Sequence, residues 1–241
     1  MNHQHSQWGD FFIGSREEIF EQLLAMVKNT LIESHSQPII GMSGGSTPKA
    51  FYEWIVQQKA LNHPEQFLWT TSDERCVSLD DKDSNCGLLK NTLLDPLNTP
   101  SEVFLPWPVG HAPEEAAKFF ENQWVERFKD RGFDLCVLGI GEDGHTASLF
   151  PHCPLIGKST GHRFAAVNWP GRGWRLTSTE HIFHLSSKIV ILGMGATKAK
   201  ILKTVLNGPM DPMEYPIQVL KPFSEKLVWL LEENAAADLI F

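Results

Sequence analysis

The stretch that decides the fold is FDLCVLGIGEDGHTASLFP, residues 133–151. It opens with a largely apolar run over 133–140, which is typical of a strand that is covered on both faces. A similar run at 188–195, KIVILGMG, is followed by the helical pattern of ATKAKILKTVL. Buried strands that alternate with helices predict an α/β fold: a doubly wound, mostly parallel sheet with helices on both faces.

The alternation of strands and helices continues on both sides of this stretch. Apolar segments predict further strands at 38–42, 67–72 and 103–105, and helical spacing predicts helices at 15–33, 49–58, 84–94 and 113–130. Ser15 is the expected N-cap of the first helix, and Thr47 followed by Pro48 is the expected start of the second. No linker rich in proline, glycine or serine divides the chain, so we expect a single domain over residues 1–241.

Composition and charge narrow the possible classes of function. The chain has 241 residues, of which 42% are hydrophobic and 21% charged, an ordinary balance for a globular protein. Its net charge of −8, with no lysine- or arginine-rich run, argues against nucleic acid and anionic membranes as partners. The sequence lacks a secretory signal pattern, an apolar run of ~20 residues and any C-x-x-C pair. We therefore expect a cytoplasmic protein with reduced cysteines.

The first candidate site motif is SGGSTP at 43–48, between a predicted strand and a predicted helix. Its two glycines let successive backbone N–H groups point into one concavity, and hydroxyl groups lie beside the start of the helix. Unpaired N–H groups, the positive end of the helix dipole and hydroxyls together are typical of a phosphate site. The spacing G-x-x-x-x-G-K-[ST] of a P-loop is absent, and the alternative is a strand-to-helix turn without a ligand.

Two further motifs contribute charged side chains. Asp73, Glu74 and Arg75 follow the predicted strand at 67–72, so at least one of them should face the crevice beyond the sheet. An arginine there supplies a planar fork for phosphate oxygens, and Asp73 is a candidate base or orienting group. Lys198 lies in the first turn of a later predicted helix, where a lysine is unfavourable unless an anion lies nearby.

The glycine-rich segment GIGEDGH, residues 139–145, allows three interpretations. Its glycines match the G-x-G-x-x-G spacing of a dinucleotide site, but Pro151 ends any helix early and no acid follows about 20 residues on. A zinc site is disfavoured because the nearby histidines and cysteines lack the spacing of zinc ligands. Asp143 and His145 instead predict an acid–base centre, since histidine titrates near neutral pH. The alternative for His145 is a structural role in the loop.

Taken together, these motifs resemble those of the 6-phosphogluconolactonase family, within a larger group of sugar-phosphate enzymes that includes glucosamine-6-phosphate deaminase. The resemblance rests on segments in the family's order: SGGSTP (43–48), DERCVSLDDKDSN (73–85), GIGEDGHTASLFP (139–151), RLTST (175–179) and GATKA (195–199). It implies a Rossmann-like α/β fold. It also implies hydrolysis of 6-phospho-D-glucono-1,5-lactone in the oxidative pentose phosphate pathway, without metal or cofactor.

The resemblance further implies a role for each matching residue. The 6-phosphate would be bound by Ser43, Gly44, Gly45, Ser46 and Thr47, with charge supplied by Arg75, Lys198 and Arg175. His145 would be the general base, Asp143 would orient it or the sugar hydroxyls, and Asp73 matches an acid near the sugar in the related deaminases. Backbone N–H groups near Gly141 or Gly144 are candidates for stabilising the tetrahedral oxyanion.

Two alternatives to the lactonase remain, and the sequence bears on both. The related deaminases resemble AFNEP after the histidine, whereas this chain has HTASLFP, with Leu149 and Phe150 where the asparagine and glutamate would fall. A non-catalytic sugar-phosphate sensor would need a DNA-binding segment, and the first 40 residues contain one helical pattern and no basic helix.

The chain departs from the family at Ser178, where an apolar residue is expected, and in the irregular NWPGRGW at 168–174.

Overall fold

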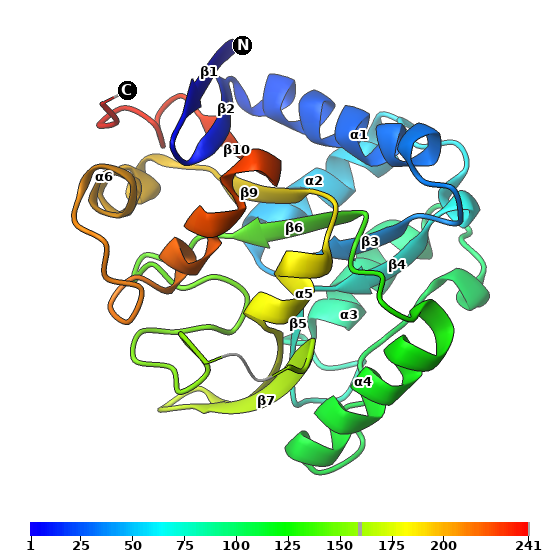
Figure 1. The fold of residues 1–241 in the computed structure, drawn as a ribbon. Coiled ribbons are helices and arrows are strands. Elements are labelled where there is room, and N and C mark those ends of the chain that lie inside the picture. The colour runs from blue at the N-terminus through cyan, green and yellow to red at the C-terminus, as the bar shows by residue number, and fades with distance from the viewer. Residues whose placement is uncertain (159–160, 241) are drawn as a thin grey trace.

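The computed structural model describes residues 1–158 and 161–240 (Figure 1). The strands are β1 (Asn2–Ser6), β2 (Gly9–Gly14), β3 (Ile39–Met42), β4 (Leu68–Thr71), β5 (Asp73–Arg75), β6 (Leu135–Gly139), β7 (Phe164–Trp169), β8 (Gly173–Ser178), β9 (Ile189–Gly193) and β10 (Leu227–Glu232). The helices are α1 (Arg16–Glu33), α2 (Ser46–Gln57), α3 (Asn85–Leu89), α4 (Pro113–Phe128), α5 (Glu180–Leu185) and α6 (Ala199–Asn207). A π-helical turn, Lys90–Leu94, continues α3.

A seven-stranded sheet forms the centre of the molecule, in the order β1-β2-β10-β9-β6-β3-β4. Neighbouring strands are parallel except β1 and β2, which form an antiparallel pair at one edge. The prediction of a mostly parallel, doubly wound sheet is confirmed. A second sheet, β5-β8-β7, is antiparallel and was not predicted from the sequence.

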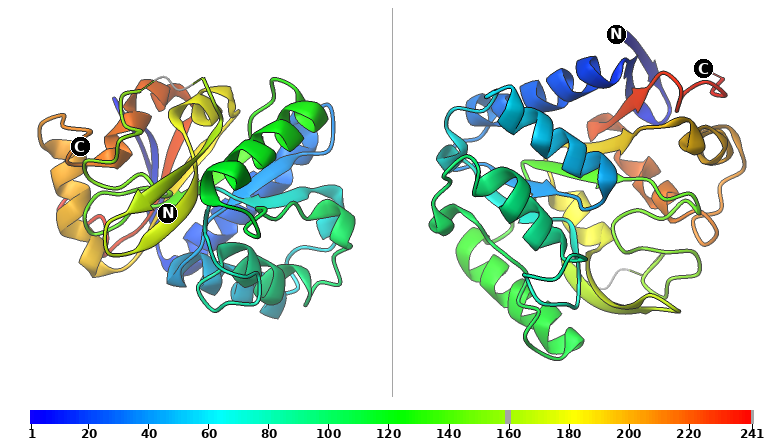
Figure 2. Two further views of the ribbon diagram at one scale, coloured as in Figure 1. Left: turned by 90° about the horizontal axis from the view of Figure 1, so that it is seen from below. Right: turned by 180° about the vertical axis from the view of Figure 1, so that it is seen from behind.

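The central strands are buried on both faces, as their apolar runs indicate. Along β6, Leu135 and Val137 pack into one core with residues of α1 and α2. Cys136 and Leu138 pack into a second core with residues of α4, α5 and α6. Figure 2 shows from behind the helices that cover the face hidden in Figure 1. Because successive side chains of a strand point to opposite faces, a strand that is apolar throughout needs a covering layer on each side.

The start of α1 was predicted correctly and the start of α2 was not. Ser15 caps α1 through a capping box, as its position before two acids indicates. The expectation that Thr47 caps the second helix was wrong, because α2 already begins at Ser46 and its N-cap is Gly45. Gly45 has a φ of 101°, a backbone conformation that favours glycine, and this lets the chain enter the helix earlier.

The predicted strand at 103–105 is also wrong. Ser101–Val103 form a 3-10 turn, and an isolated bridge between Trp69 and Phe104 connects this segment to the central sheet. Pro100 and Pro106 bound the segment, and a proline has no backbone N–H to donate to a strand ladder. The apolar run of three residues therefore forms this single bridge and no strand.

Two general expectations concern membranes and cysteines. In the described part of the chain, no helix is both long and apolar enough to cross a membrane. All four cysteines lie in that part and are free thiols. Burial raises the pKa of Cys86, Cys136 and Cys153, so these thiols remain protonated and packed at neutral pH.

Candidate active site

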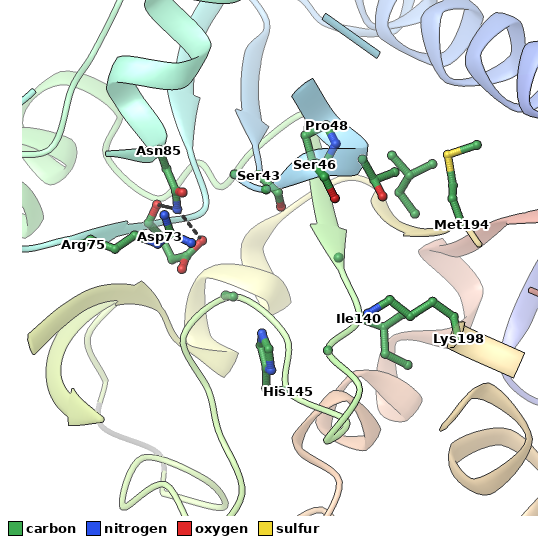
Figure 3. A pocket seen from close by; sticks show the side chains of 17 residues that line it. Ser43, Ser46, Pro48, Asp73, Arg75, Asn85, Ile140, His145, Met194 and Lys198 are labelled. Carbon is green, nitrogen blue, oxygen red and sulfur yellow. Dashed lines mark hydrogen bonds between the residues drawn. The ribbon is translucent and has the colours of Figure 1, made fainter. Parts of the chain in front are cut away.

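A pocket of about 220 Å³ opens at the carboxyl ends of β3, β6 and β9 (Figure 3). Four of the sequence motifs contribute residues to its lining: the segment 43–48, the segment that begins with strand β5, the segment after β6 and, through Lys198, the segment 195–199. Open parallel sheets bind ligands at this end of their strands. The volume lies below the ~300–1,000 Å³ of pockets for drug-sized ligands, so it suits a compact sugar better than a dinucleotide.

Residues 43–48 form one wall of the pocket: 43–45 are a loop, and 46–48 are the first residues of α2. The first N–H groups of a helix have no partner within the helix, and they lie at its positive end. The hydroxyl of Ser43 is already engaged, because it donates to the carbonyl oxygen of Val137 at 2.7 Å. The hydroxyls of Ser46 and Thr47 and the loop N–H groups therefore form the part of this wall that can face an anion.

Gly44 lies against Asn85, a residue that the sequence patterns did not single out. A Cβ added at Gly44 would lie 1.7 Å from Oδ1 of Asn85, so no side chain fits at Gly44 while Asn85 keeps its place. Asn85 also lines the pocket and donates from Nδ2 to the backbone carbonyl of Asp73 at 2.9 Å. The signal available in the sequence was its position directly after Ser84, the N-cap of α3.

Successive side chains of β5 point to opposite faces of the strand, so the three charged residues of DER do not all face the pocket. Asp73 and Arg75 line the pocket, whereas Glu74 does not and is 1% exposed. The Ser148 hydroxyl donates to Oδ2 of Asp73 at 2.7 Å, and Nδ2 of Asn85 lies 3.3 Å from Oδ1. Asp73 therefore ties β5 and the start of α3 to the segment that follows β6.

Glu74 stabilises the start of α3 instead of facing a ligand. Its carboxylate accepts hydrogen bonds from the N–H groups of Arg75, Asn85 and Cys86 at 2.7 Å and from the Ser84 hydroxyl at 2.9 Å. Burial raises the pKa of Glu74, and these four hydrogen bonds act against that rise because they favour the ionised form. The residue closes the loop between β5 and α3.

We expect Glu74→Gln to destabilise the fold by about 2–4 kcal/mol, because the amide nitrogen cannot accept from the N–H groups that face it. Chemical denaturation measures this loss. Glu225→Gln, at an exposed position, is the matched control and should change the free energy of unfolding by less than about 0.5 kcal/mol. A loss below about 1 kcal/mol for Glu74→Gln would contradict the role of Glu74.

His145 and Asp143 form a close pair on the segment after β6. Nδ1 of His145 is 2.5 Å from Oδ1 of Asp143, which also accepts the backbone N–H of His145 at 3.2 Å. Partial burial opposes ionisation of Asp143, but the hydrogen bonds and electrostatic attraction of His145 together outweigh it and lower the pKa of Asp143 to about 2. Since an ionised carboxylate only accepts, Nδ1 is the ring nitrogen that donates to Asp143, and in the neutral imidazole Nε2 is then the nitrogen with the lone pair.

The N–H groups expected to stabilise an oxyanion are engaged elsewhere. Gly141 donates to the carbonyl of His145 at 2.9 Å, and Gly144 donates to the carbonyl of Gly141 at 3.1 Å. These bonds close a tight turn, so the N–H groups of Gly141 and Gly144 themselves are engaged, and the expectation is narrowed to other N–H groups near them. The residues from 140 to 158 also form turns and loops in place of the helix that a dinucleotide fingerprint requires.

Of the three basic residues predicted for the site, Arg75 and Lys198 line the pocket and Arg175 does not. Figure 3 shows Arg75 beside Asp73 and Lys198, the N-cap of α6, on the opposite side. Arg175 is paired directly with Arg75 across β5 and β8, but it is not among the residues that line the pocket. Burial, together with the charge of Arg75, lowers the pKa of Arg175. Like charges that face each other across a sheet are destabilising, and an anion bound beside them would relieve this repulsion.

Fold and pocket together define a class of protein. It is a doubly wound α/β protein in which a loop at a helix N-terminus faces a histidine that is oriented by a carboxylate. Such an arrangement can hold an anionic group on one side and accept a proton on the other. Among residues 1–158 and 161–240, no three His, Cys, Asp or Glu side chains are grouped so as to hold a metal ion.

The chain belongs to the glucosamine-6-phosphate isomerase/6-phosphogluconolactonase family, whose sequence profile matches residues 15–229. A 6-phosphogluconolactonase of Synechocystis sp. is 34% identical over 234 residues, which cover 93% of this chain and 95% of the relative. The solved structure of 6-phosphogluconolactonase from Trypanosoma cruzi is similar over 100% of both chains, with a TM-score of 0.84 and 21% identity.

A solved structure of a monomeric glucosamine-6-phosphate deaminase is also similar. It has a TM-score of 0.80 and 19% identity, and the match covers 95% of this chain and 99% of the deaminase. The likeness to these two structures establishes the fold, which both chemistries share. The choice between the chemistries therefore depends on the side chains of the site.

Proposed function

We propose that this chain hydrolyses 6-phospho-D-glucono-1,5-lactone to 6-phosphogluconate. The observation that carries the proposal is the pair of Asp143 and His145 at a pocket whose other wall is the loop before α2 (Figure 3). Hydrolysis of a lactone requires a positioned water and a group that accepts and returns one proton. Relatives named 6-phosphogluconolactonase in Synechocystis and Nostoc support this choice of substrate.

His145 is the general base in this proposal. Its Nε2 takes a proton from water while the water oxygen bonds to the lactone carbonyl carbon and the carbonyl π electrons move to oxygen. The tetrahedral intermediate then breaks its bond to the ring oxygen, which receives the proton back from Nε2. Asp143 keeps the proton on Nδ1 and stabilises the imidazolium that forms in between.

The phosphate binds at the positive end of α2 in this proposal. The loop N–H groups and the hydroxyls of Ser46 and Thr47 donate to its oxygens, and Arg75 and Lys198 supply positive charge within a chain of net charge −8. Asp73 accepts hydrogen bonds from Ser148 and Asn85. It thereby fixes the part of the pocket that lies between the segment after β6 and the start of α3, where the sugar binds in this proposal.

The residues after the histidine favour lactone hydrolysis over deamination. Leu149 and Phe150 are 1% and 6% exposed and pack in the apolar core, so neither supplies a group for proton transfer. The related deaminases are expected to have a glutamate at the position of Phe150, where it would complete a proton relay. For the sensor alternative, the described residues before β3 form β1, β2 and α1, an arrangement unlike a helix-turn-helix.

A coupled assay tests the proposed function. The purified protein is mixed with freshly prepared 6-phosphogluconolactone and a metal chelator, and glucosamine 6-phosphate is supplied in parallel. We expect lactone hydrolysis well above its spontaneous rate and no release of ammonia from the amino sugar. Hydrolysis at the spontaneous rate would refute the proposal, whereas activity that disappears only with chelator would refute metal independence alone.

We expect Asp143→Asn to lower kcat by about 10- to 1,000-fold with little change in KM, because an amide can donate to Nδ1 and shift the proton to Nε2. Steady-state kinetics on the lactone measure this effect. Equal kcat values for the variant and the wild type would contradict the orienting role of Asp143.

The same variant has a pH signature in stability. The folded-state pKa of about 2 lies below the ~3.9 of an unfolded aspartate, so the carboxylate stabilises the fold above about pH 4 and loses this contribution as the pH falls toward 2. The side chain is 40% exposed, so solvent screening keeps the contribution small. Unfolding midpoints measured between pH 5 and 2 should therefore fall less steeply for Asp143→Asn.

A further inference from the structure

The hairpin of β7 and β8 brings an aromatic side chain against the proposed base. The ring centroids of Trp169 and His145 are 4.8 Å apart and their planes cross at 76°, so one ring meets the other edge-on. The same indole stacks on Phe150, with centroids 5.0 Å apart and an interplanar angle of 18°. The guanidinium of Arg172 lies 4.7 Å from the centre of the indole ring. Trp169 is thus in contact with three side chains at once.

The backbone of the hairpin holds Trp169 in this place. Trp169 is the last residue of β7 and is paired with Gly173, the first residue of β8. The N–H of Arg172 donates to the carbonyl of Trp169 at 2.9 Å and closes the turn between them. This turn is part of NWPGRGW at 168–174, the segment in which the chain departs from the family pattern.

We propose that Trp169 is a positioning residue for His145 and that the hairpin tip, together with Asp143, sets the direction of Nε2. The inference rests on the proposed function, in which His145 is the base. The hydrogen bond to Asp143 fixes the position of Nδ1, and the ring also lies against Gly141, but neither contact sets the direction of Nε2 on the side of the hairpin. The indole blocks movement of the imidazole on that side.

The neighbours of Trp169 make it a stiff support. Phe150 is 6% exposed and belongs to the apolar core, so the indole rests on a side chain that is itself fixed. Arg172 is exposed and contacts the indole by a cation–π interaction. Displacement of a catalytic group by about 1 Å can cost roughly 10²-fold in rate, so an unsupported imidazole should lower turnover without changing how the phosphate binds.

The test compares Trp169→Ala, Trp169→Phe and Trp174→Ala in steady-state kinetics on the lactone. Trp174 is a matched control, since it lies on the same hairpin and is 37% exposed. We expect Trp169→Ala to lose about 10- to 100-fold in kcat with KM within about 3-fold, and Trp169→Phe to recover most of the loss. Trp174→Ala should behave like the wild type. Wild-type kcat for Trp169→Ala would overturn the inference.

A double-mutant cycle with His145→Ala separates positioning from other roles. If Trp169 acts through His145, Trp169→Ala causes no further loss in kcat once His145 is replaced. The same loss in both backgrounds would overturn the inference while leaving the proposed function intact.

A second readout does not depend on activity. In the free protein, the side-chain NMR signals of His145 should move toward those of an unconstrained histidine in Trp169→Ala and stay in place in Trp174→Ala. Unchanged signals in Trp169→Ala would overturn the inference. Normal turnover of His145→Ala would instead refute His145 as the base. In that case the NMR signals of His145 would still test whether Trp169 positions its ring.

Discussion

The variant His145→Ala is expected to lose about 10²- to 10⁴-fold in kcat on 6-phosphogluconolactone, with little change in KM. The side chain lines the pocket, and its Nδ1 is bound to a carboxylate that stays ionised, so Nε2 is the atom placed to take a proton from water. Alanine removes this proton acceptor and leaves the loop before α2, the proposed phosphate site, unchanged. Initial rates over a range of lactone concentrations, corrected for spontaneous hydrolysis, give both parameters.

A second histidine serves as the control for this experiment. His152 lies on the same segment, is largely exposed and is paired with Glu214 at the surface. It has a φ of 60°, so His152→Asn is the suitable substitution, because asparagine tolerates this conformation. We expect His152→Asn to keep wild-type kinetics. Near-normal kcat for His145→Ala would remove His145 as the base.

The variants Lys198→Ala and Arg75→Ala are each expected to raise KM for the phosphorylated lactone by about 10- to 100-fold, with a smaller effect on kcat. Each removes a charge-assisted contact, which contributes about 1.5–3 kcal/mol. KM for a gluconolactone without phosphate should stay the same, because these side chains are proposed to contact the phosphate alone. Comparison of the two substrates therefore separates phosphate binding from general damage to the pocket.

Lys200 is the matched control for Lys198. It lies on α6, is exposed and does not line the pocket. Lys200→Ala should therefore leave KM unchanged for both lactones. Unchanged KM in Lys198→Ala and Arg75→Ala would mean that the phosphate binds outside this pocket.

Much of the central sheet could be predicted from the sequence, and the physical reason is burial. β6 and β9 are covered on both faces, so each is an uninterrupted apolar run that stands out from its surroundings. The edge strand β1, NHQHS, has no such signal because most of its side chains are exposed. β5 is three residues long and pairs with β8 about 100 residues later, so the second sheet depends on contacts that no local pattern records.

The candidate site was predicted in its residue types better than in its contacts. Asp73, Arg75, His145 and Lys198 come from distant segments, and the structure brings all four to one pocket. The engagement of the Ser43 hydroxyl with a carbonyl of β6 depends on how neighbouring strands align. That alignment follows from the packing of the whole sheet and cannot be read from a loop motif.

The contact between Gly44 and Asn85 has a consequence for protein engineering. Because a Cβ at Gly44 would collide with Oδ1 of Asn85, any side chain at Gly44 requires the Asn85 side chain to move, and a library that randomises Gly44 alone should return mainly the parent residue. Shortening Asn85 in the same clone makes room for larger side chains. Since Asn85 also donates to the carbonyl of Asp73, that exchange loosens the attachment of β5 as well. Selection for new sugar substrates should therefore recover changes at the two positions together.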